Sequence, residues 1–161
     1  MRAARRWKQL VMGAVIATAG ACASMSGGGA AAGGGTADGV KLYQRLGGYD
    51  ALAAVTDDFL GRLLSNPVTA PYFKGLEPWQ KNRVRQLIVD QLCEASGGPC
   101  IYIGRPMLLA HEQLQMDEKV WNAFAGDFVA TLTKFKVPDR EQRELLEIVG
   151  SMKNDVLRGG H

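Results

Sequence analysis

The sequence predicts an all-α fold in which several helices cross around a common core. After residue 40, apolar residues recur every three or four positions, which is the spacing of one helical face. Glycine pairs and single prolines separate these stretches, as expected at helix ends. No stretch shows the alternation typical of a β-strand, and no internal repeat is present. Residues 40–161 have the length of one ordinary domain, and we expect them to share one core.

Residues 1–21 have the features of a bacterial secretion signal. Basic residues come first, and an uncharged stretch of small and apolar residues follows from Leu10 to Ala21. That stretch is too short to span a bilayer, but it suits the apolar region of a signal peptide. It ends in Ala19-Gly20-Ala21-Cys22, which resembles the cleavage and lipidation site of bacterial lipoproteins; ordinary cleavage beside Cys22 is the alternative. We expect a secreted, periplasmic protein held to the membrane by a lipid on Cys22.

Residues 22–39 are rich in glycine and alanine. A segment of this composition buries almost no surface and behaves as a flexible chain. We expect it to be a tether between the lipid anchor and the domain, and a tail without a function is the alternative.

The net charge gives no sign of a nucleic-acid partner. The full sequence has 19 Lys and Arg against 16 Asp and Glu, a formal charge of +3. Residues 1–25 hold four of the basic residues and no acidic one, so the chain without them carries −1. A basic surface of the kind that binds nucleic acid is therefore not expected.

Three helices are expected in the first half of the domain. Val40–Leu46 is a short helix that the following glycine pair ends. Tyr49–Ser65 has apolar residues at helical spacing and ends before Asn66-Pro67. After an irregular corner over Val68–Gly75, the third helix covers Glu77–Ser96, with a proline in its first turn.

Cys93 and Cys100 lie at the end of the third helix and just after Gly97-Gly98-Pro99, which breaks it. If Cys22 is lipidated, these two cysteines remain as an even pair in an oxidising compartment, which favours a disulfide. Two buried thiols are the alternative, and a metal site is not expected because no further Cys or His lies near them.

Three more helices complete the expected fold. A loop runs to Gly104, and Pro106 then opens a helix that contains Met107 and His111 on one face. Asp117 is suited to cap a helix that extends to Phe135. Pro138 starts a last helix, which ends at the glycine pair before the C-terminus.

His111 is the residue on which a functional site would depend. The other histidine, His161, is the last residue of the chain. The sequence has no nucleophile–base motif, no phosphate-binding glycine loop and no C-x-x-C-H motif for covalent haem. A lone histidine on an apolar helical face is most often a packed core residue. The functional interpretation is a neutral imidazole that coordinates the iron of a porphyrin in a large apolar cavity.

Several motifs together resemble the group 1 truncated haemoglobins. Residues 42–48 read LYQRLGG, residues 55–59 read VTDDF and residues 71–73 read PYF. Residues 97–111 then run from GGP through YIGRPM to AH. The motifs occur in the order found in that family and at similar distances, and the resemblance covers about residues 40–157.

The resemblance implies a truncated globin, a two-over-two helical sandwich that holds a non-covalent haem b. His111 matches the proximal ligand of the iron, and Phe73 matches the aromatic residue that lies against the porphyrin. The residues that match the sides and the proximal face of the haem site are Tyr102, Met107, Met116 and Trp121. Each of these side chains has an ordinary packing role as its alternative.

The distal side departs from the family. Many members place a tyrosine directly after the phenylalanine that matches Phe59, and this chain has Leu60 there. Counting back from Gly97, the other distal positions are Val84 and Ile88, where polar residues are common in the family. Bound O₂ would then lack a hydrogen bond, which is worth about 0.5–1.5 kcal/mol.

The register of the distal side depends on where an insertion lies. The segment from Phe73 to Gly97 is longer than usual in the family, and another position of the gap would bring Lys81 or Arg85 to the pocket.

The sequence therefore predicts a haem-binding globin for the diatomic gases O₂, CO and NO, acting in ligand binding or redox sensing at the cell envelope, with an unidentified redox partner. An apolar distal pocket argues against NO dioxygenase or peroxidase activity, and no turnover reaction is expected. The alternative is a haem-free globin-fold lipoprotein that serves as a structural or interaction module.

Overall fold

The computed structural model describes residues 39–158, which form helices joined by turns and loops without a strand. The predicted all-α class is confirmed for this part of the chain. The elements in chain order are α1 (Leu42–Arg45), α2 (Gly48–Ser65), the 3₁₀ helix η2 (Ala70–Phe73), α3 (Pro78–Ala95), α4 (Met107–His111), α5 (Glu118–Lys134), α6 (Asp139–Ser151) and α7 (Lys153–Arg158).

The predicted signal peptide, Cys22, nearly all of the predicted tether, and His161 lie outside the described residues. Within residues 39–158, none of the helices combines the length and the hydropathy that a membrane span requires.

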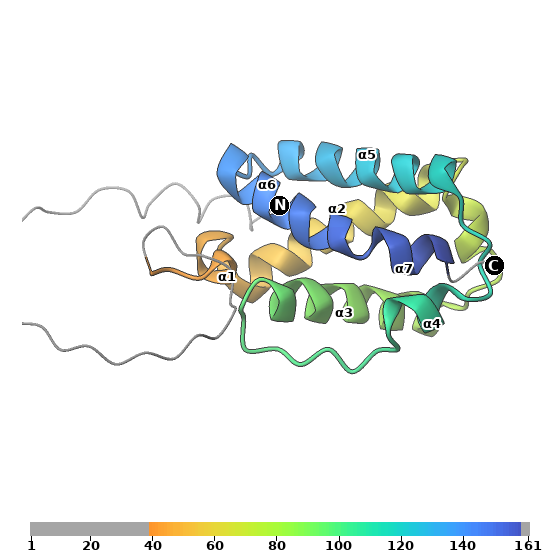
Figure 1. The fold of residues 1–161 in the computed structure, drawn as a ribbon, viewed down its shortest axis with the longest axis horizontal. Coiled ribbons are helices and arrows are strands. Elements are labelled where there is room, and N and C mark those ends of the chain that lie inside the picture. Colours follow the sequence, from red (N-terminus) through yellow and green to blue (C-terminus); the bar gives the residue numbers. More distant parts are fainter. Residues whose placement is uncertain (1–38, 159–161) are drawn as a thin grey trace, which may run out of the picture. The chain divides into compact units, whose positions relative to one another are not determined.

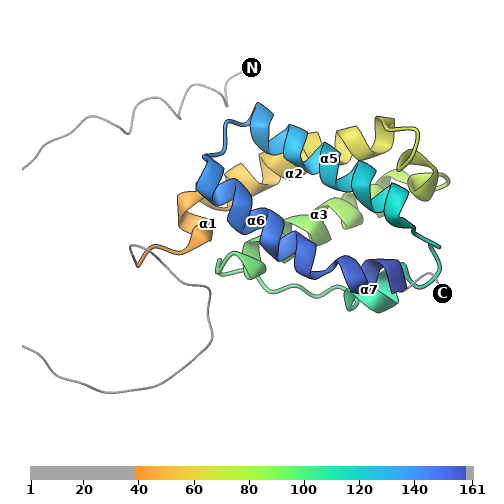
Figure 2. The same cartoon turned by 45° about the horizontal axis from the view of Figure 1, so that its top comes forward.

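Two antiparallel helix pairs make up the domain. The helices α2 and α3 run in opposite directions and pack along each other, and α5 runs opposite to α6 and α7 (Figures 1 and 2). The pairs are joined because α5 packs on α2, while α4 packs on α7. This is the predicted two-over-two sandwich.

The turn between α1 and α2 depends on its two glycines. Gly47 and Gly48 have φ angles of 93° and 79°, in the left-handed region that glycine adopts without a steric penalty. Nearby, the Tyr43 amide donates to the Ser96 carbonyl at 2.9 Å, which joins α1 to the end of α3.

The helices α3 and α5 begin where local side chains accept hydrogen bonds from backbone amides. The Asp117 carboxylate accepts a hydrogen bond from the Val120 amide at 2.9 Å, which confirms the predicted cap of α5. At the start of α3 the Gln80 side chain accepts from the Glu77 amide at 2.8 Å, and Pro78 occupies the first turn.

The sequence predicted one continuous helix after Pro138, and this prediction was wrong. The structure divides the segment at Met152 into α6 and α7. The Met152 amide bonds the Val149 carbonyl three residues back, at 3.1 Å, instead of the carbonyl four residues back. Next to it, the Ser151 hydroxyl donates to the Ile148 carbonyl at 2.7 Å. Serine hydroxyls that bond the preceding turn bend helices, and Gly150 weakens the same turn.

The core lies between the helix pairs and is closed by aromatic rings. The Phe59 ring centroid is 5.0 Å from the centroids of both Phe124 and Phe128, so α2 and α5 interlock at this point. The core cluster consists of Leu42, Leu46, Leu52, Val55, Phe59, Leu63, Leu92, Cys93, Phe128, Leu132 and Leu145.

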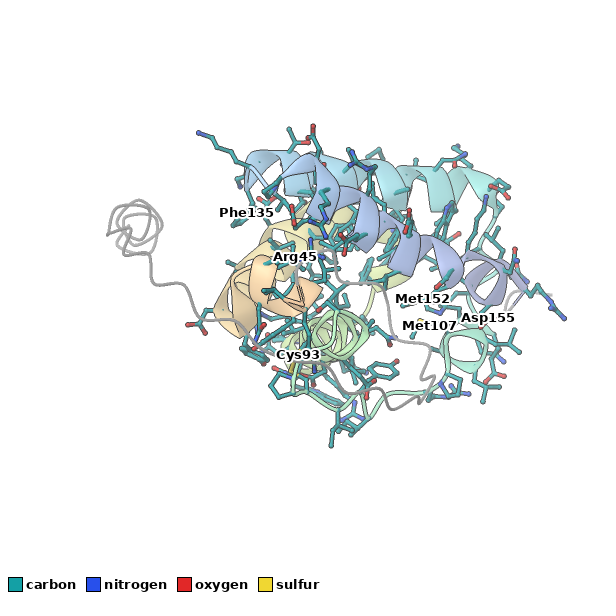
Figure 3. All side chains as sticks on the ribbon, turned by 60° about the vertical axis from the view of Figure 1, so that its left-hand side comes forward. Arg45, Cys93, Met107, Phe135, Met152 and Asp155 are labelled. Atoms are coloured by element: carbon teal, nitrogen blue, oxygen red, sulfur yellow. A yellow bond between two sulfur atoms is a disulfide. The ribbon has the colours of Figure 1, made fainter. Side chains whose placement is uncertain are left out.

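A mostly buried ion-pair network fastens α1 to α6. The Arg45 guanidinium binds the carboxylates of Glu141 and Glu144, and Arg140 also pairs with Glu144 at 3.1 Å. Figure 3 shows Arg45 between α1 and α6, the helix that contains Glu141 and Glu144. The hydrogen bond from Arg45 lowers the pKa of the Glu144 carboxyl below its usual value of 4.5.

The lowered pKa of Glu144 predicts a specific loss of stability in acid. A carboxyl with a lowered folded-state pKa stabilises the fold above its unfolded pKa, near 4.5, and this contribution disappears as the pH falls below that value. We expect Glu144→Gln to lower the free energy of unfolding at pH 7 by about 1–3 kcal/mol. Urea unfolding from pH 7 to pH 3 should show this difference shrinking below pH 4.5, whereas the exposed control Glu147→Gln should match wild type. A difference that stays constant down to pH 3 would contradict the assignment.

Candidate functional site

A large apolar cavity of about 610 Å³ lies inside the described domain. Its volume is in the range of cavities that hold small-molecule ligands or cofactors. One wall comes from α3, and the facing wall comes from α4 together with α7. The helices α3 and α4 both line the cavity but are not closely packed on each other, so the cavity separates them.

His111 occupies the last position of α4 and lines the cavity. Its Nδ1 atom lies 2.8 Å from the Met107 carbonyl oxygen. A carbonyl only accepts, so Nδ1 carries the hydrogen in this contact, and in the neutral imidazole this leaves the lone pair on Nε2. A backbone bond of this kind fixes the ring and leaves Nε2 as a metal ligand.

Residues 97–106 form the loop that leads to α4, and the disulfide between Cys93 and Cys100 fastens this loop to α3. The Cα atoms of the two cysteines are 5.8 Å apart. Gly98 lies against the bridge, since a Cβ atom at this position would come within 2.6 Å of both Cys93 Sγ and the Tyr43 ring. Only glycine allows this close approach.

Tyr102 takes its place in the cavity wall from the same loop. Its ring lies over Gly104, where a Cβ atom would overlap the ring. The Tyr102 hydroxyl donates to the Arg105 carbonyl at 2.9 Å, and burial raises the pKa of this phenol. The ring is therefore held by its own loop with its face available to the cavity.

Most of the residues that the sequence analysis assigned to the site line this one cavity. On the α3 side they are Val84 and Ile88. With His111, the others are Phe73, Tyr102, Met107, Met116 and Trp121. Figure 3 shows Met107 of α4 facing Met152 at the junction of α6 and α7.

Leu60 is the exception and requires a correction. It is buried, but it does not line the cavity. Its neighbours Phe59 and Leu63 line the cavity instead. Successive residues of a helix are turned by about 100°, so the side chains directly before and three positions after Leu60 define the inward face of α2.

The register of α3 follows the apolar alternative. Val84, Leu87 and Ile88 line the cavity, whereas Lys81 does not. Arg85 points away and pairs with Asp57, with Nη2 2.9 Å from Oδ2. The Arg85 hydrogen bond lowers the pKa of the Asp57 carboxyl, so this pair belongs to the outer surface of α2 and α3.

Four polar residues of the cavity, Thr69 among them, were not expected from the sequence. Arg83 and Arg105 are exposed residues at the cavity, and their guanidinium groups are suited to bind the carboxylates of a ligand. Gln91 lines the interior, one turn beyond Ile88 on the same face of α3. The periodicity of α3 could have indicated Gln91, but a polar side chain at such a position is normally assumed to face solvent.

The cavity has the features that a haem requires. The walls are mainly hydrocarbon and aromatic, as a porphyrin surface demands. One imidazole has a ring nitrogen that the backbone does not engage. Two cationic side chains at the cavity, Arg83 and Arg105, could pair with the carboxylates of a haem, although Arg105 also pairs with Glu112. The residues present therefore fit this group.

The chain is similar in sequence and in fold to known globins. Residues 41–158 match a family model described as bacterial-like globin. The group 1 truncated hemoglobin GlbN of Synechocystis sp. is 32% identical over 122 residues, which covers 72% of this chain and 96% of that protein. GlbN of Mycolicibacterium paratuberculosis is 28% identical over 123 residues, which covers 76% of this chain and 88% of that protein.

Solved structures of truncated hemoglobins have a similar fold. The 2/2 hemoglobin of Synechococcus sp., in the cyanomet state and with covalently attached heme, is 29% identical with a TM-score of 0.68, covering 73% of this chain and 98% of that one. The Fe(III) form of truncated hemoglobin from Tetrahymena pyriformis has the same TM-score and the same coverage at 24% identity, which supports the fold alone.

The disulfide predicts a measurable loss when it is removed. In the chain-entropy model, a bridge that closes a loop with a sequence separation of 7 contributes about 2–3 kcal/mol. Replacing both cysteines, as Cys93→Ala with Cys100→Ala, should lower the free energy of unfolding by that amount, measured by urea unfolding. Thiol counting on denatured, unreduced wild-type protein should find neither cysteine free. Two free thiols per chain, or a double variant as stable as wild type, would show that the bridge is absent or unimportant.

Proposed function

Because the chain belongs to the bacterial-like globin family and has group 1 truncated haemoglobins as relatives, we propose that it binds diatomic gases at a haem iron held by His111, at the cell envelope. Haem b is the cofactor of this globin. When bound, it would supply an iron that can take O₂, CO or NO.

The observation that carries the proposal is the state of His111. Its Nδ1 atom bonds the Met107 carbonyl, which leaves Nε2 as the ring nitrogen available to a metal, and the side chain lines the cavity. Tyr102 and Trp121 line the same cavity and present flat apolar surfaces to the macrocycle. Arg83 and Arg105 also line the cavity and would hold its carboxylates.

The cavity wall formed by α3 influences which gas ligand binds, more than it influences the binding of the haem. Val84, Leu87 and Ile88 exclude water and offer no hydrogen bond, so CO and NO, which depend less on polar help, bind well. An apolar wall of this kind suits ligand binding, or redox sensing with an unidentified electron donor. It suits NO dioxygenase or peroxidase activity less well.

Attachment at the cell envelope is supported by the sequence before the domain. The basic leader, the apolar stretch and the small residues before Cys22 resemble a lipoprotein signal. The glycine-rich segment that follows has the composition of a tether, which would keep the globin clear of the membrane.

Haem binding through His111 has a direct spectroscopic test. Titration of the purified chain with haemin should produce a sharp Soret band at one equivalent, and reduction under CO should shift it. His111→Ala should weaken haem retention by at least tenfold, because the iron loses its protein ligand, while the loss of a side chain in the exposed control Gln113→Ala should not. An equal Soret band in His111→Ala and wild type, or no band in either, would favour the haem-free module.

The lipid anchor is tested separately in bacterial cells. The full-length chain should fractionate with membranes and partition into detergent, whereas Cys22→Ser should be released as a water-soluble protein. Recovery of wild type and variant alike in the soluble periplasm would show ordinary signal cleavage.

A further inference from the structure

Four large apolar side chains lie exposed within the short segment 101–109. Ile101 and Ile103 are each 73% exposed, and Leu108 and Leu109 are 39% and 43% exposed. Apolar residues on a protein surface are usually scattered singly, whereas a group of them marks a contact with another molecule or with a membrane. We call these four side chains the apolar strip.

The apolar strip lies on the outer side of the wall that contains His111. In α4, Met107, Ala110 and His111 line the cavity, whereas Leu108 and Leu109 do not. Successive residues of a helix are turned by about 100°, so the two leucines point away from the cavity.

The loop before α4 continues the same outer surface. Tyr102 lines the cavity, and Ile101 beside it does not. Ile103 borders the cavity but keeps 73% of its surface exposed, so it lies at the opening. Figure 1 shows the loop passing along the outside of α3 and leading directly into α4. Side chains that stay in water add little to the core, so packing within the domain does not account for the strip.

The charges around the strip suit the surface of a bilayer. Residues 95–111 contain no acidic side chain, and Arg105 is the charged residue among them. Arg105 pairs with Glu112 just after this segment, and the exposed Lys41 lies against Gly97 near its start. Apolar side chains that are flanked by cationic ones are typical of surfaces that bind membranes with anionic lipids.

The chain that precedes the domain joins it beside this surface. A Cβ atom at Gly97 would come within 3.2 Å of the Lys41 side chain, and the Tyr43 amide donates to the Ser96 carbonyl at 2.9 Å. Figures 1 and 2 show α1 beside the start of the loop that leads to the strip. The chain from Cys22 to Lys41 can extend by at most about 65 Å, so a lipid on Cys22 would keep the loop close to the membrane.

We propose that the apolar strip inserts into the surface of a lipid bilayer that contains anionic lipids, and that the anchored domain therefore lies with its loop and α4 against the membrane. This inference rests on the proposed attachment to the cell envelope. The strip is small, so its own binding is weak and reversible, and the lipid on Cys22 supplies the high local concentration at which it binds. Because Ile103 lies at the opening, the cavity opens toward hydrocarbon, in which apolar gases dissolve better than in water.

The first test measures binding to vesicles of phosphatidylethanolamine and phosphatidylglycerol, using the haem-loaded Cys22→Ser chain, which has no lipid of its own. Ile101→Ser combined with Leu109→Ser should lower the fraction that floats with the vesicles by about threefold or more, because two apolar contacts are lost. Neither residue lines the cavity, so the haem spectrum should stay unchanged. The matched control, Leu64→Ser with Val129→Ser, replaces two other exposed apolar residues, on α2 and α5, and should bind like the starting chain.

A second test locates the strip in the lipidated, haem-loaded chain reconstituted into the same vesicles. Leu109→Cys supplies a free thiol for a nitroxide label, since Cys93 and Cys100 are bridged. The nitroxide should be accessible to dissolved O₂ and protected from a water-soluble nickel chelate, as expected for a label in hydrocarbon. The same label on Val129→Cys, an exposed position of α5, should show the reverse pattern.

Three results would overturn the proposal. Equal vesicle binding by the Ile101 and Leu109 double variant and by the control pair would show that the strip does not contact lipid. A label at position 109 that the nickel chelate reaches as readily as one at position 129 would show that the domain stands clear of the membrane. A chain that sediments as a dimer, and as a monomer after the double change in the strip, would show that a second copy covers it.

The proposed function would fail in a different way. None of these three results affects haem binding or the lipid on Cys22. A wild-type chain that gives no haem spectrum would refute the proposed cofactor site, and a full-length chain recovered without a lipid would refute the anchor. Vesicle binding by the Cys22→Ser chain is measured independently of the anchor.

Discussion

The separation of α3 from α4 is the constraint on which the rest of the structure depends. Two helices with apolar faces would ordinarily pack together and remove those faces from water. Here they stand on opposite sides of a cavity of about 610 Å³, and only the flanking helices, η2 and the 97–106 loop hold them apart. A flat apolar cofactor placed between them supplies the missing part of the core. Binding of haem and stability of the fold are therefore thermodynamically linked.

The wall that contains His111 is built from backbone contacts more than from side-chain packing. The Met107 carbonyl orients the imidazole, and the Arg105 carbonyl anchors the Tyr102 hydroxyl. Gly98 lets the loop pass close to the disulfide, which joins this wall to the end of α3. Because the bridge fixes one end of the loop and α7 supports α4 at the other, the spacing of the two walls is set at both ends.

Features that depend on neighbouring residues could be predicted from the sequence. The glycine turn before α2 and the Asp117 cap follow from spacing and residue type, whereas the cavity-facing positions of α3 came from the resemblance to the truncated haemoglobins. Features that depend on a single side chain or on distant partners could not. The break at Met152 accompanies one serine hydroxyl bond, and Arg45 meets partners almost a hundred residues away in sequence.

The distal side of the site also contains residues that could be predicted from the sequence and residues that could not. The resemblance identified the face of α3 correctly, but it gave no reason to place an amide on it. On α2 the motif directed attention to the residue after Phe59, while the rotation of the helix brings Phe59 itself to the cavity.

The short length of α4 has a further consequence. A helix of five residues is not stable alone, because nucleation costs more than so few hydrogen bonds return. It persists through its contact with α7, so the position of His111 in the cavity wall depends on a helix that lies more than forty residues further along the chain.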